Sequence, residues 1–322
     1  MTGVYNDKIV FWRSFLINAL ILITTLLVVY LVDFVNPAPA VLRDYRFHRD
    51  LYAFISGFIL GFAGSVLQAS LRNPLVDHYV LGVGSTSLFA AYLTIAVTGV
   101  VDSTRIAISS LAGGLSGLLL SISIANLLGG GEVSYILSGI GVASVFSGAS
   151  FLLSYYILEK QPYAQALLLG SFATPSKEYM PYLVAATAAV ILSYILLAKR
   201  LNVLLLGDIY SRQLGVEPSL TRLVSTLIAG SVASVVVGFF GTIGFVGLIT
   251  PNLTRLLTKT SDNRVVIMYS SVTSGALLLA TDLLARKALV ASVGEVPAGG
   301  VVSALGGLFF LGLLIREVRG SR

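Results

Sequence analysis

The sequence predicts an all-α, polytopic membrane protein with about ten transmembrane helices. Of its 322 residues, 56% are hydrophobic and 11% are charged, and the mean hydropathy is +0.90. A soluble globular chain carries roughly 25% charged residues, so this chain has too few charges to coat a water-facing surface. The 32 glycines fit the same class, because small residues let membrane helices approach one another closely. An ordinary soluble enzyme and a disordered protein are excluded.

Stretches without charged residues define the expected helices. A membrane-spanning helix needs about 20 apolar residues, and lipid admits only helices and closed barrels. The apolar residues here form continuous runs instead of alternating with polar ones, which favours helices. Stretches without Asp, Glu, Lys or Arg cover residues 14–32, 51–71, 79–101, 106–131, 133–158, 179–198, 223–254, 265–281 and 296–315.

The 223–254 stretch is long enough to hold two helices. It contains the glycine-rich run from Gly238 to Gly244, and a break there would leave helices near 221–240 and 243–258. Both would be short, so we expect one to be tilted or irregular where it lines a cavity. The split raises the count to ten spans and places both termini on one side. The first stretch is expected to be a retained span, since its 19 residues exceed the roughly 7–15 of a signal-peptide core.

The distribution of basic residues predicts the orientation. With ten spans, 13 of the 21 Lys and Arg residues fall on the side of the termini and eight on the other side. Because cytoplasmic loops carry an excess of Lys and Arg, both termini are expected in the cytoplasm. The net charge of +6 then reflects basic inner loops and not nucleic-acid binding. Arg43, Arg46 and Arg49 form an outward cluster that could meet acidic residues of a binding protein, or lipid headgroups and solvent.

The longest polar stretch on the termini side is 199–222. Gly207 and Gly215 bracket a short helical piece, and leucines give the stretch an apolar side. Two interpretations remain open: an amphipathic helix that rests at the lipid headgroups, or a docking element for a cytoplasmic partner.

The sequence lacks the residues that several kinds of site require. The chain has no cysteine, and its two histidines, His48 and His78, lie in polar stretches, which argues against a metal or haem site built on membrane-buried His. Neither Gly129–Gly131 nor Gly299–Gly300 is followed by the Lys of a phosphate-binding loop. We therefore expect no ATPase site and no cofactor in this chain.

Two other function classes are disfavoured. A serine protease built on Ser116 would need a general base, and no His lies in any expected span. This argues against a membrane enzyme. An ion-coupled secondary transporter usually carries ionisable residues in mid-span, whereas these spans are almost bare of them. Dependence of uptake on ATP or on a proton gradient would discriminate a transporter driven by a separate ATPase from an ion-coupled one.

Several long motifs, in a fixed order, resemble one family. They are residues 60–93 (LGFAGSVLQASLRNPLVDHYVLGVGSTSLFAAYL), 201–218 (LNVLLLGDIYSRQLGVEP), 241–257 (GTIGFVGLITPNLTRLL), 277–289 and 295–314. They are similar to the FecCD-like permease subunits of type II ABC importers for iron–siderophore complexes, haem and vitamin B12. The likeness covers most of the chain.

The resemblance implies a single transmembrane permease domain over 1–322, with 199–222 as a coupling loop within it. It implies a dimer with a second copy or a paralogue, two cytoplasmic ATPase subunits that bind the ATP, and an extracytoplasmic substrate-binding protein. The cargo would be an iron complex or cobalamin that enters the cytoplasm. Oxyanion import by the same kind of machinery stays open as an alternative.

The resemblance also assigns site residues. The coupling loop would use Leu206, Gly207, Asp208, Ser211, Arg212, Leu214 and Gly215. Leu206 and Leu214 would be buried as anchors in the ATPase, with Asp208 and Arg212 paired at the rim. The translocation pathway and its gate would use Gln68, Asn73, Pro74, Gly244, Gly247, Pro251, Asn252 and Arg255.

Two further positions complete the comparison with the family pattern. Asp282 and Arg286, one helical turn apart, would form a structural ion pair. The family usually has Pro-His where this chain has Pro251-Asn252, which puts in doubt any gating role for that position.

Overall fold

The computed structural model describes residues 2–35, 39–158, 169–287 and 296–320. In these ranges all regular elements are helices, which confirms the predicted class. They are α1 (Thr2–Asp33), α2 (Ala40–Leu71), α3 (Val83–Thr98), α4 (Ser103–Leu127), α5 (Glu132–Leu158), the 3-10 turn η1 (Lys177–Tyr179), α7 (Met180–Leu205), α8 (Asp208–Gln213), α9 (Pro218–Phe240), α10 (Val246–Thr258), α11 (Asn263–Lys287) and α13 (Ala298–Gly320).

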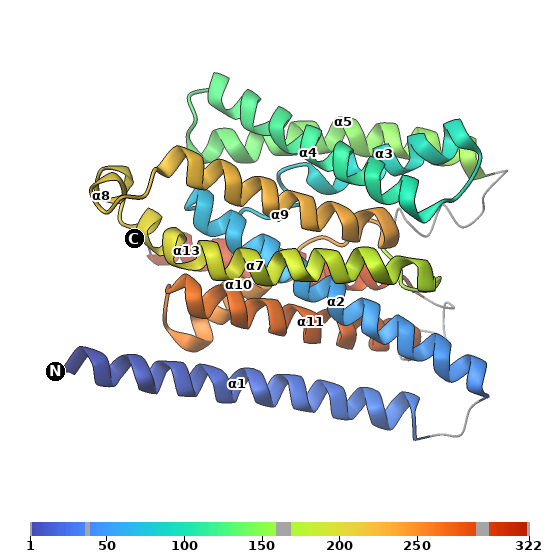
Figure 1. Ribbon diagram of the computed structural model, residues 1–322, viewed down its shortest axis with the longest axis horizontal. Helices are drawn as coiled ribbons and strands as arrows, with labels where there is room; N and C mark the ends of the chain where they lie inside the picture. Colours follow the sequence, from blue (N-terminus) through green and yellow to red (C-terminus); the bar gives the residue numbers. More distant parts are fainter. Residues whose placement is uncertain (1, 36–38, 159–168, 288–295, 321–322) are drawn as a thin grey trace.

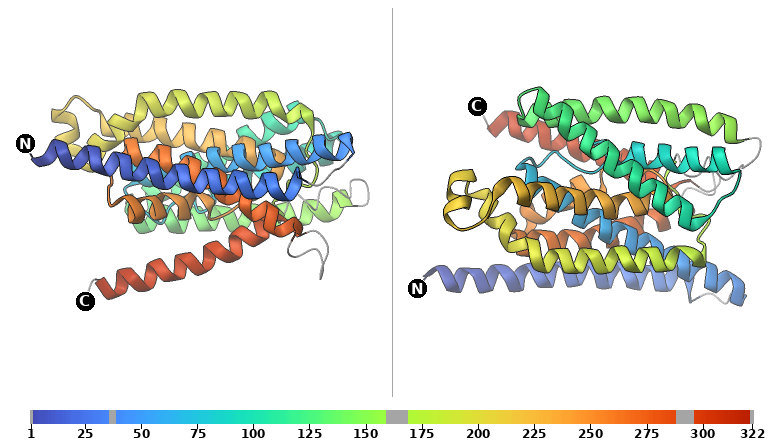
Figure 2. Two further views of the ribbon diagram at one scale, coloured as in Figure 1. Left: turned by 90° about the horizontal axis from the view of Figure 1, so that it is seen from below. Right: turned by 45° about the horizontal axis from the view of Figure 1, so that its top comes forward.

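The long helices run side by side as one bundle (Figure 1). The start of α1, the end of α13 and the short α8 lie at the same end, as ten passes require (Figures 1 and 2). We call this the α8 end. Seven described helices are long and apolar enough to cross a membrane, and α3 and the apolar part of α13 are shorter. The 13 residues of α10 reach only about 20 Å, less than the roughly 30 Å of hydrocarbon.

α2 lies at the centre of the bundle. It packs against α7, α9, α10 and α11. In its apolar stretch of 18 residues, 78% of the residues are buried. α1 lies at the edge, against α11, and only 11% of the residues in its apolar stretch of 18 residues are buried. Most of the apolar surface of α1 therefore remains for lipid or for another chain. α3, α4 and α5 form a second group on the opposite side of α9 (Figure 1).

The break that the glycines predicted falls at residues 241–245, between α9 and α10. Gly241 ends α9 with φ +79°, and Phe245 precedes α10 with φ +66°. Ser171 donates its N–H to the Phe240 carbonyl at the end of α9 (2.9 Å). Gly299 donates to the Gly170 carbonyl (2.8 Å), which joins two segments that lie against Thr242 of the break. Irregular backbone at membrane depth is tolerated because protein surrounds it.

A second irregular segment, residues 72–82, joins α2 to α3. It begins with Arg72 in a left-handed conformation (φ 50°) and ends with Gly82 (φ 79°). Asn73 Oδ1 accepts the N–H of Leu75 at 2.8 Å, and Asp77 Oδ1 accepts those of Tyr79 and Val80. Side chains of the segment therefore accept hydrogen bonds from its own backbone and stabilise its turns. The helix that follows, α3, is only 16 residues long.

Glycines on α2 let two helices come into backbone contact with it. Gly57 and Gly61 face the α11 backbone around Ser274. A Cβ on Gly64 would lie 1.9 Å from the carbonyl oxygen of Gly247 in α10. Gly57, Gly61 and Gly64 therefore serve contacts inside one chain.

We predict that Gly64→Ala lowers the thermal stability of the chain, because the added methyl must push α10 away from α2. The expected loss is about 1–3 kcal/mol, as for other overpacked sites. Gly148→Ala on α5 is the matched control, since a Cβ there has no neighbour within 4 Å. Melting temperatures of both variants in detergent would check this, and equal values would contradict the α2–α10 contact.

Candidate functional site

An exposed apolar patch surrounds the short helix α8. Ile209 is 72% exposed, Tyr210 62%, Leu214 61%, Leu206 58% and Leu205 42%. These five residues, here called the α8 patch, lie at the same end as both termini (Figure 1). Contiguous exposed apolar surface rimmed by polar groups is typical of an interaction site. Of the predicted coupling residues, Leu206 and Leu214 belong to the patch.

Polar side chains fix α8 to the rest of the bundle. Asp208 accepts from Arg72 at the end of α2 (2.5 Å) and from Arg222 in α9 (3.0 Å to Oδ2). The Arg222 guanidinium, aided by that of Arg72, lowers the pKa of the Asp208 carboxyl below its usual range. Ser211, fully buried, donates to the Val203 carbonyl of α7 at 2.9 Å. Asp208 is thus paired with Arg72 and Arg222, and not with Arg212 as the sequence suggested.

The two glycines that bracket α8 have backbone roles. Gly207 has φ +105° and Gly215 has φ +78°, conformations that other residues avoid. Arg212 is 63% exposed and lies 3.6 Å from Glu217. A substitution of Gly207 would strain the backbone as well as add bulk, so it is a poor probe of partner contact.

The predicted gating residues meet where the end of α2 touches α10. Arg255 donates to Gln68 Oε1 at 2.6 Å, and Gln68 Nε2 lies 3.5 Å and 3.4 Å from the Gly247 and Leu248 carbonyl oxygens. Asn252 donates to the Pro74 carbonyl at 2.8 Å. Asn252, which replaces the family's usual His, therefore joins α10 to the 72–82 segment. We call this contact the α2–α10 junction.

Of the other predicted gating residues, all but Gly244 lie near the junction. Pro251 is inside α10 and buried. Asn73 and Pro74 border a cavity of about 250 Å³ together with Gln68 and Arg255. Gly244 lies away from it, where an added Cβ would be 3.5 Å from the Tyr79 ring. The predicted residues therefore divide between the junction, which holds most of them, and Gly244, which lies against Tyr79 in the wall of a second, larger pocket.

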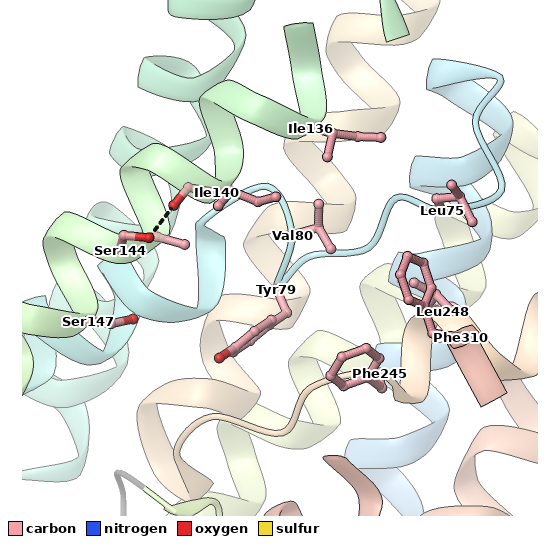
Figure 3. A pocket seen from close by; sticks show the side chains of 11 residues that line it. Leu75, Tyr79, Val80, Ile136, Ile140, Ser144, Ser147, Phe245, Leu248 and Phe310 are labelled. Atoms are coloured by element: carbon pink, nitrogen blue, oxygen red, sulfur yellow. Dashed lines mark hydrogen bonds between the residues drawn. The ribbon is translucent and has the colours of Figure 1, made fainter. Parts of the chain in front are cut away.

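That second pocket has a volume of about 590 Å³ and lies between α5, the 72–82 segment, the start of α10 and α13 (Figure 3). Tyr79 and Phe245 face each other across 6.4 Å between ring centres. Its lining, as far as the structure describes it, carries no charge: Leu75, Tyr79, Val80, Ile136, Ile140, Ala143, Ser144, Ser147, Phe245, Leu248 and Phe310. Sequence reasoning missed this pocket because its residues come from four separated segments.

At the opposite end, three acidic and three basic side chains form a charged cluster, which is buried except for Lys287 at 41% exposure. Arg49 donates to both carboxylate oxygens of Asp282 at 2.8 Å. Arg286 pairs with Asp33 (2.6 Å) and Asp50, and Lys287 lies 3.4 Å from Asp33. The six charges sum to zero, and the cluster joins α1, α2 and α11.

The cluster revises two interpretations of the sequence. Arg286 Nε lies 3.2 Å from Asp282 Oδ2, so the local pair is one edge of a larger network. Arg49 was predicted to face outward, but it is 2% exposed and engaged by Asp282. Arg46 donates to the Asp33 carbonyl at 2.8 Å. The separation of 233 residues between Arg49 and Asp282 hid this pair from pattern reasoning.

His78 also differs from expectation. It falls in a polar part of the sequence, yet it is fully buried within the 72–82 segment. The polar neighbour Asp77 forms the turns of this segment, as the two hydrogen bonds to Asp77 Oδ1 show.

This architecture defines a multi-pass helical membrane protein with an uncharged pocket on one face and an exposed apolar patch at one end, which is the form of a transport permease. A family model described as the FecCD transport family matches residues 9–316. The chain therefore belongs to the FecCD transport family, as its motifs suggested.

Two curated relatives and one solved structure are consistent with this family membership. The chain is 33% identical over 288 residues to a cobalamin import system permease of Halobacterium salinarum, covering 88% of this chain and 75% of that one. It is 31% identical over 282 residues to an iron(3+)-hydroxamate import system permease of Bacillus subtilis, covering 87% and 72%. A structure described as an inward-facing metal-chelate type ABC transporter matches 97% of this chain and 99% of that one, with a TM-score of 0.75 and 27% identity.

We predict that Asp282→Asn strongly destabilises the chain, because it leaves the buried Arg49 without its counter-charge. Breaking one partner of a buried pair costs about 3–5 kcal/mol. Asp44→Asn is the control: Asp44 is half exposed and pairs with the exposed Lys177 at 2.9 Å, so its loss should change little. Thermal unfolding in detergent would compare them, and equal melting temperatures would mean that the cluster is not structural.

Proposed function

We propose that this chain is the permease subunit of an ABC importer that carries a metal chelate, haem or cobalamin inward, driven by ATPase subunits in separate chains. The observation that carries the proposal is the agreement over nearly the whole chain with a metal-chelate type transporter, together with family membership. The uncharged lining of the large pocket supports a bulky organic complex as cargo. An oxyanion would call for cationic or donor-rich walls there.

The large pocket suits one half of a pathway between two permease subunits. Its walls come from the 72–82 segment, α5, α10 and α13. A two-fold axis through this face would join two such pockets into one weakly attractive channel. A second copy of the chain, or a paralogue, is the partner we propose for this face.

The α8 patch is the proposed contact with the ATPase. Its apolar side chains would be buried in a cleft of the motor, while Asp208 and Ser211 hold the base of α8 to α2, α9 and α7. A push on α8 would therefore move the end of α2 through Arg72. Gln68, one helical turn earlier on α2, would pass that movement to α10. The junction is thus proposed as the link between motor and pathway.

We place the α8 end in the cytoplasm, on the excess of basic residues there. A substrate-binding protein would then dock at the opposite end. Arg46 and Arg49 are poor candidates for that contact, since the cluster and the Asp33 carbonyl occupy them.

Reporter fusions test the orientation. We expect enzymes that report a cytoplasmic location to be active when fused to either end of the chain, because ten passes return the C-terminus to the starting side. Activity of a reporter specific for the outer side at either end would overturn the orientation.

The central test is uptake by a reconstituted complex. The chain, its ATPase and its binding protein are placed in proteoliposomes, and uptake of labelled ferric hydroxamate, haem, cobalamin and molybdate is measured. ATP-dependent uptake of one metal complex, unaffected by a proton ionophore, is expected. Uptake without the ATPase, driven by a proton gradient, would contradict the proposal.

The same preparation tests the coupling surface. Leu214→Asp should remove ATPase co-purification and uptake, because an unpaired charge in a dry contact costs a few kcal/mol, or about two decades in affinity. Gln213→Asp adds the same charge one residue away without removing an apolar side chain, and should retain binding. Full ATPase binding by Leu214→Asp would favour the alternative that α8 merely rests on lipid.

A further inference from the structure

A small cavity lies beside the α2–α10 junction, at the α8 end. Its volume is about 250 Å³. The end of α2, the end of α7, α10 and the start of α11 line it, through Gln68, Ala69, Arg72, Asn73, Pro74, Leu205, Arg255, Ser261 and Asn263. We call it the junction cavity, and it is distinct from the large apolar pocket.

Two guanidinium groups from different elements line the junction cavity. Arg255 donates to two neutral oxygens, Gln68 Oε1 at 2.6 Å and Asn252 Oδ1 at 3.4 Å. In the described ranges no carboxylate lies within ion-pair distance of it. Arg72 uses one terminal nitrogen for Asp208, but its Nε is buried and has no hydrogen-bond partner among the described residues. Both side chains thus keep donor capacity for a ligand.

Asn263, at the start of α11, also lines the cavity. It is 1% exposed, and its side-chain Nδ2 has no hydrogen-bond partner in the described part of the chain. Its backbone N–H donates to Asn202 Oδ1 at 2.7 Å, which fixes the residue at the start of α11. A buried donor without an acceptor is costly and calls for an explanation. A bound acceptor in the adjoining cavity supplies one.

The nearby carboxylates have other partners. Asp208 is held by Arg72 and Arg222, and Asp262 accepts from Asn202 (2.6 Å) and Arg264. Neither acidic residue is in the cavity wall. The lining therefore combines two positive charges with an unused amide donor and, among the described residues, presents no negative charge.

We propose that the junction cavity binds a phosphate group. A phosphate offers several acceptor oxygens in a tetrahedral arrangement, which suits a cavity wall that carries donor side chains from three segments, at the end of α2, on α10 and at the start of α11. The group could belong to a free phosphate compound or to the headgroup of an anionic lipid, since this end of the bundle also meets the membrane surface. Arg72 is shared by the cavity and Asp208, so the ligand lies one side chain from the helix proposed to contact the ATPase.

The test measures binding to the purified full-length chain in neutral detergent, with ³²P-labelled inorganic phosphate as one probe. A second arm uses nanodiscs of phosphatidylcholine with added phosphatidylglycerol and measures lipid retained by the chain. Saturable binding of phosphate at one site per chain is expected if the source is soluble. Retention of phosphatidylglycerol with no phosphate binding identifies a lipid source. Failure to bind either probe would overturn the proposal.

Variants separate the cavity from general surface charge. Asn263→Ala removes the unpartnered donor and should weaken binding about tenfold, the size expected for one hydrogen bond to a charged group. Because that donor has no partner among the described residues, the variant should fold as well as the parent. Arg255→Gln should weaken binding further, and its melting temperature shows whether the junction survives.

Lys259→Gln is the matched control. Lys259 is one turn beyond Arg255, exposed, and outside the cavity wall. The control should bind the probe as the parent does. Equal loss in Lys259→Gln and Asn263→Ala would mean that diffuse charge, and not the cavity, attracts the anion.

Discussion

Lipid offers no hydrogen-bond partner to an interrupted helix, and this constraint organises the whole molecule. The chain interrupts its helices at 72–82 and at 241–245, and each interruption depends on the protein around it. Asn252 of α10 donates to the Pro74 carbonyl of the first segment, and the Gly170 region pairs with the backbone around the second. The close contact of Gly64 with Gly247 brings the two helices near enough for this exchange. Both pockets lie beside these interruptions.

The arrangement links distant parts of the chain through few side chains. Arg72 ends α2 and holds Asp208 of α8, while Gln68 of the same helix receives a hydrogen bond from Arg255 of α10. The last turn of α2 therefore stands between the exposed patch and the irregular backbone that borders the large pocket. A rigid central helix with polar contacts at its end is well suited to carry movement without a change in its own fold.

Local features of the sequence predicted most of the helices. The absence of charge over about 20 residues, and the glycines near 241, indicate the spans and their break because both are properties of one segment. The bracketing glycines of α8 were likewise visible, and their positive φ angles agree with that interpretation. The prediction for Arg49 was wrong because the sequence shows only its neighbours Arg43 and Arg46. Its partner in the folded chain, Asp282, lies on another helix. The large pocket and the junction cavity, which Asn263 lines, each form where several separate segments pack together. A pattern within one segment of the sequence cannot predict them.

The charge cluster has a consequence for how the chain is made. Arg49 and Asp50 enter with the second helix, while their partners Asp282 and Arg286 belong to α11 and leave the ribosome much later. Until then, Arg49 and Asp50 lack the α11 side chains that hold them in the folded chain. A chain that ended before α11 would therefore leave the centre of the bundle without its charged partners at this end.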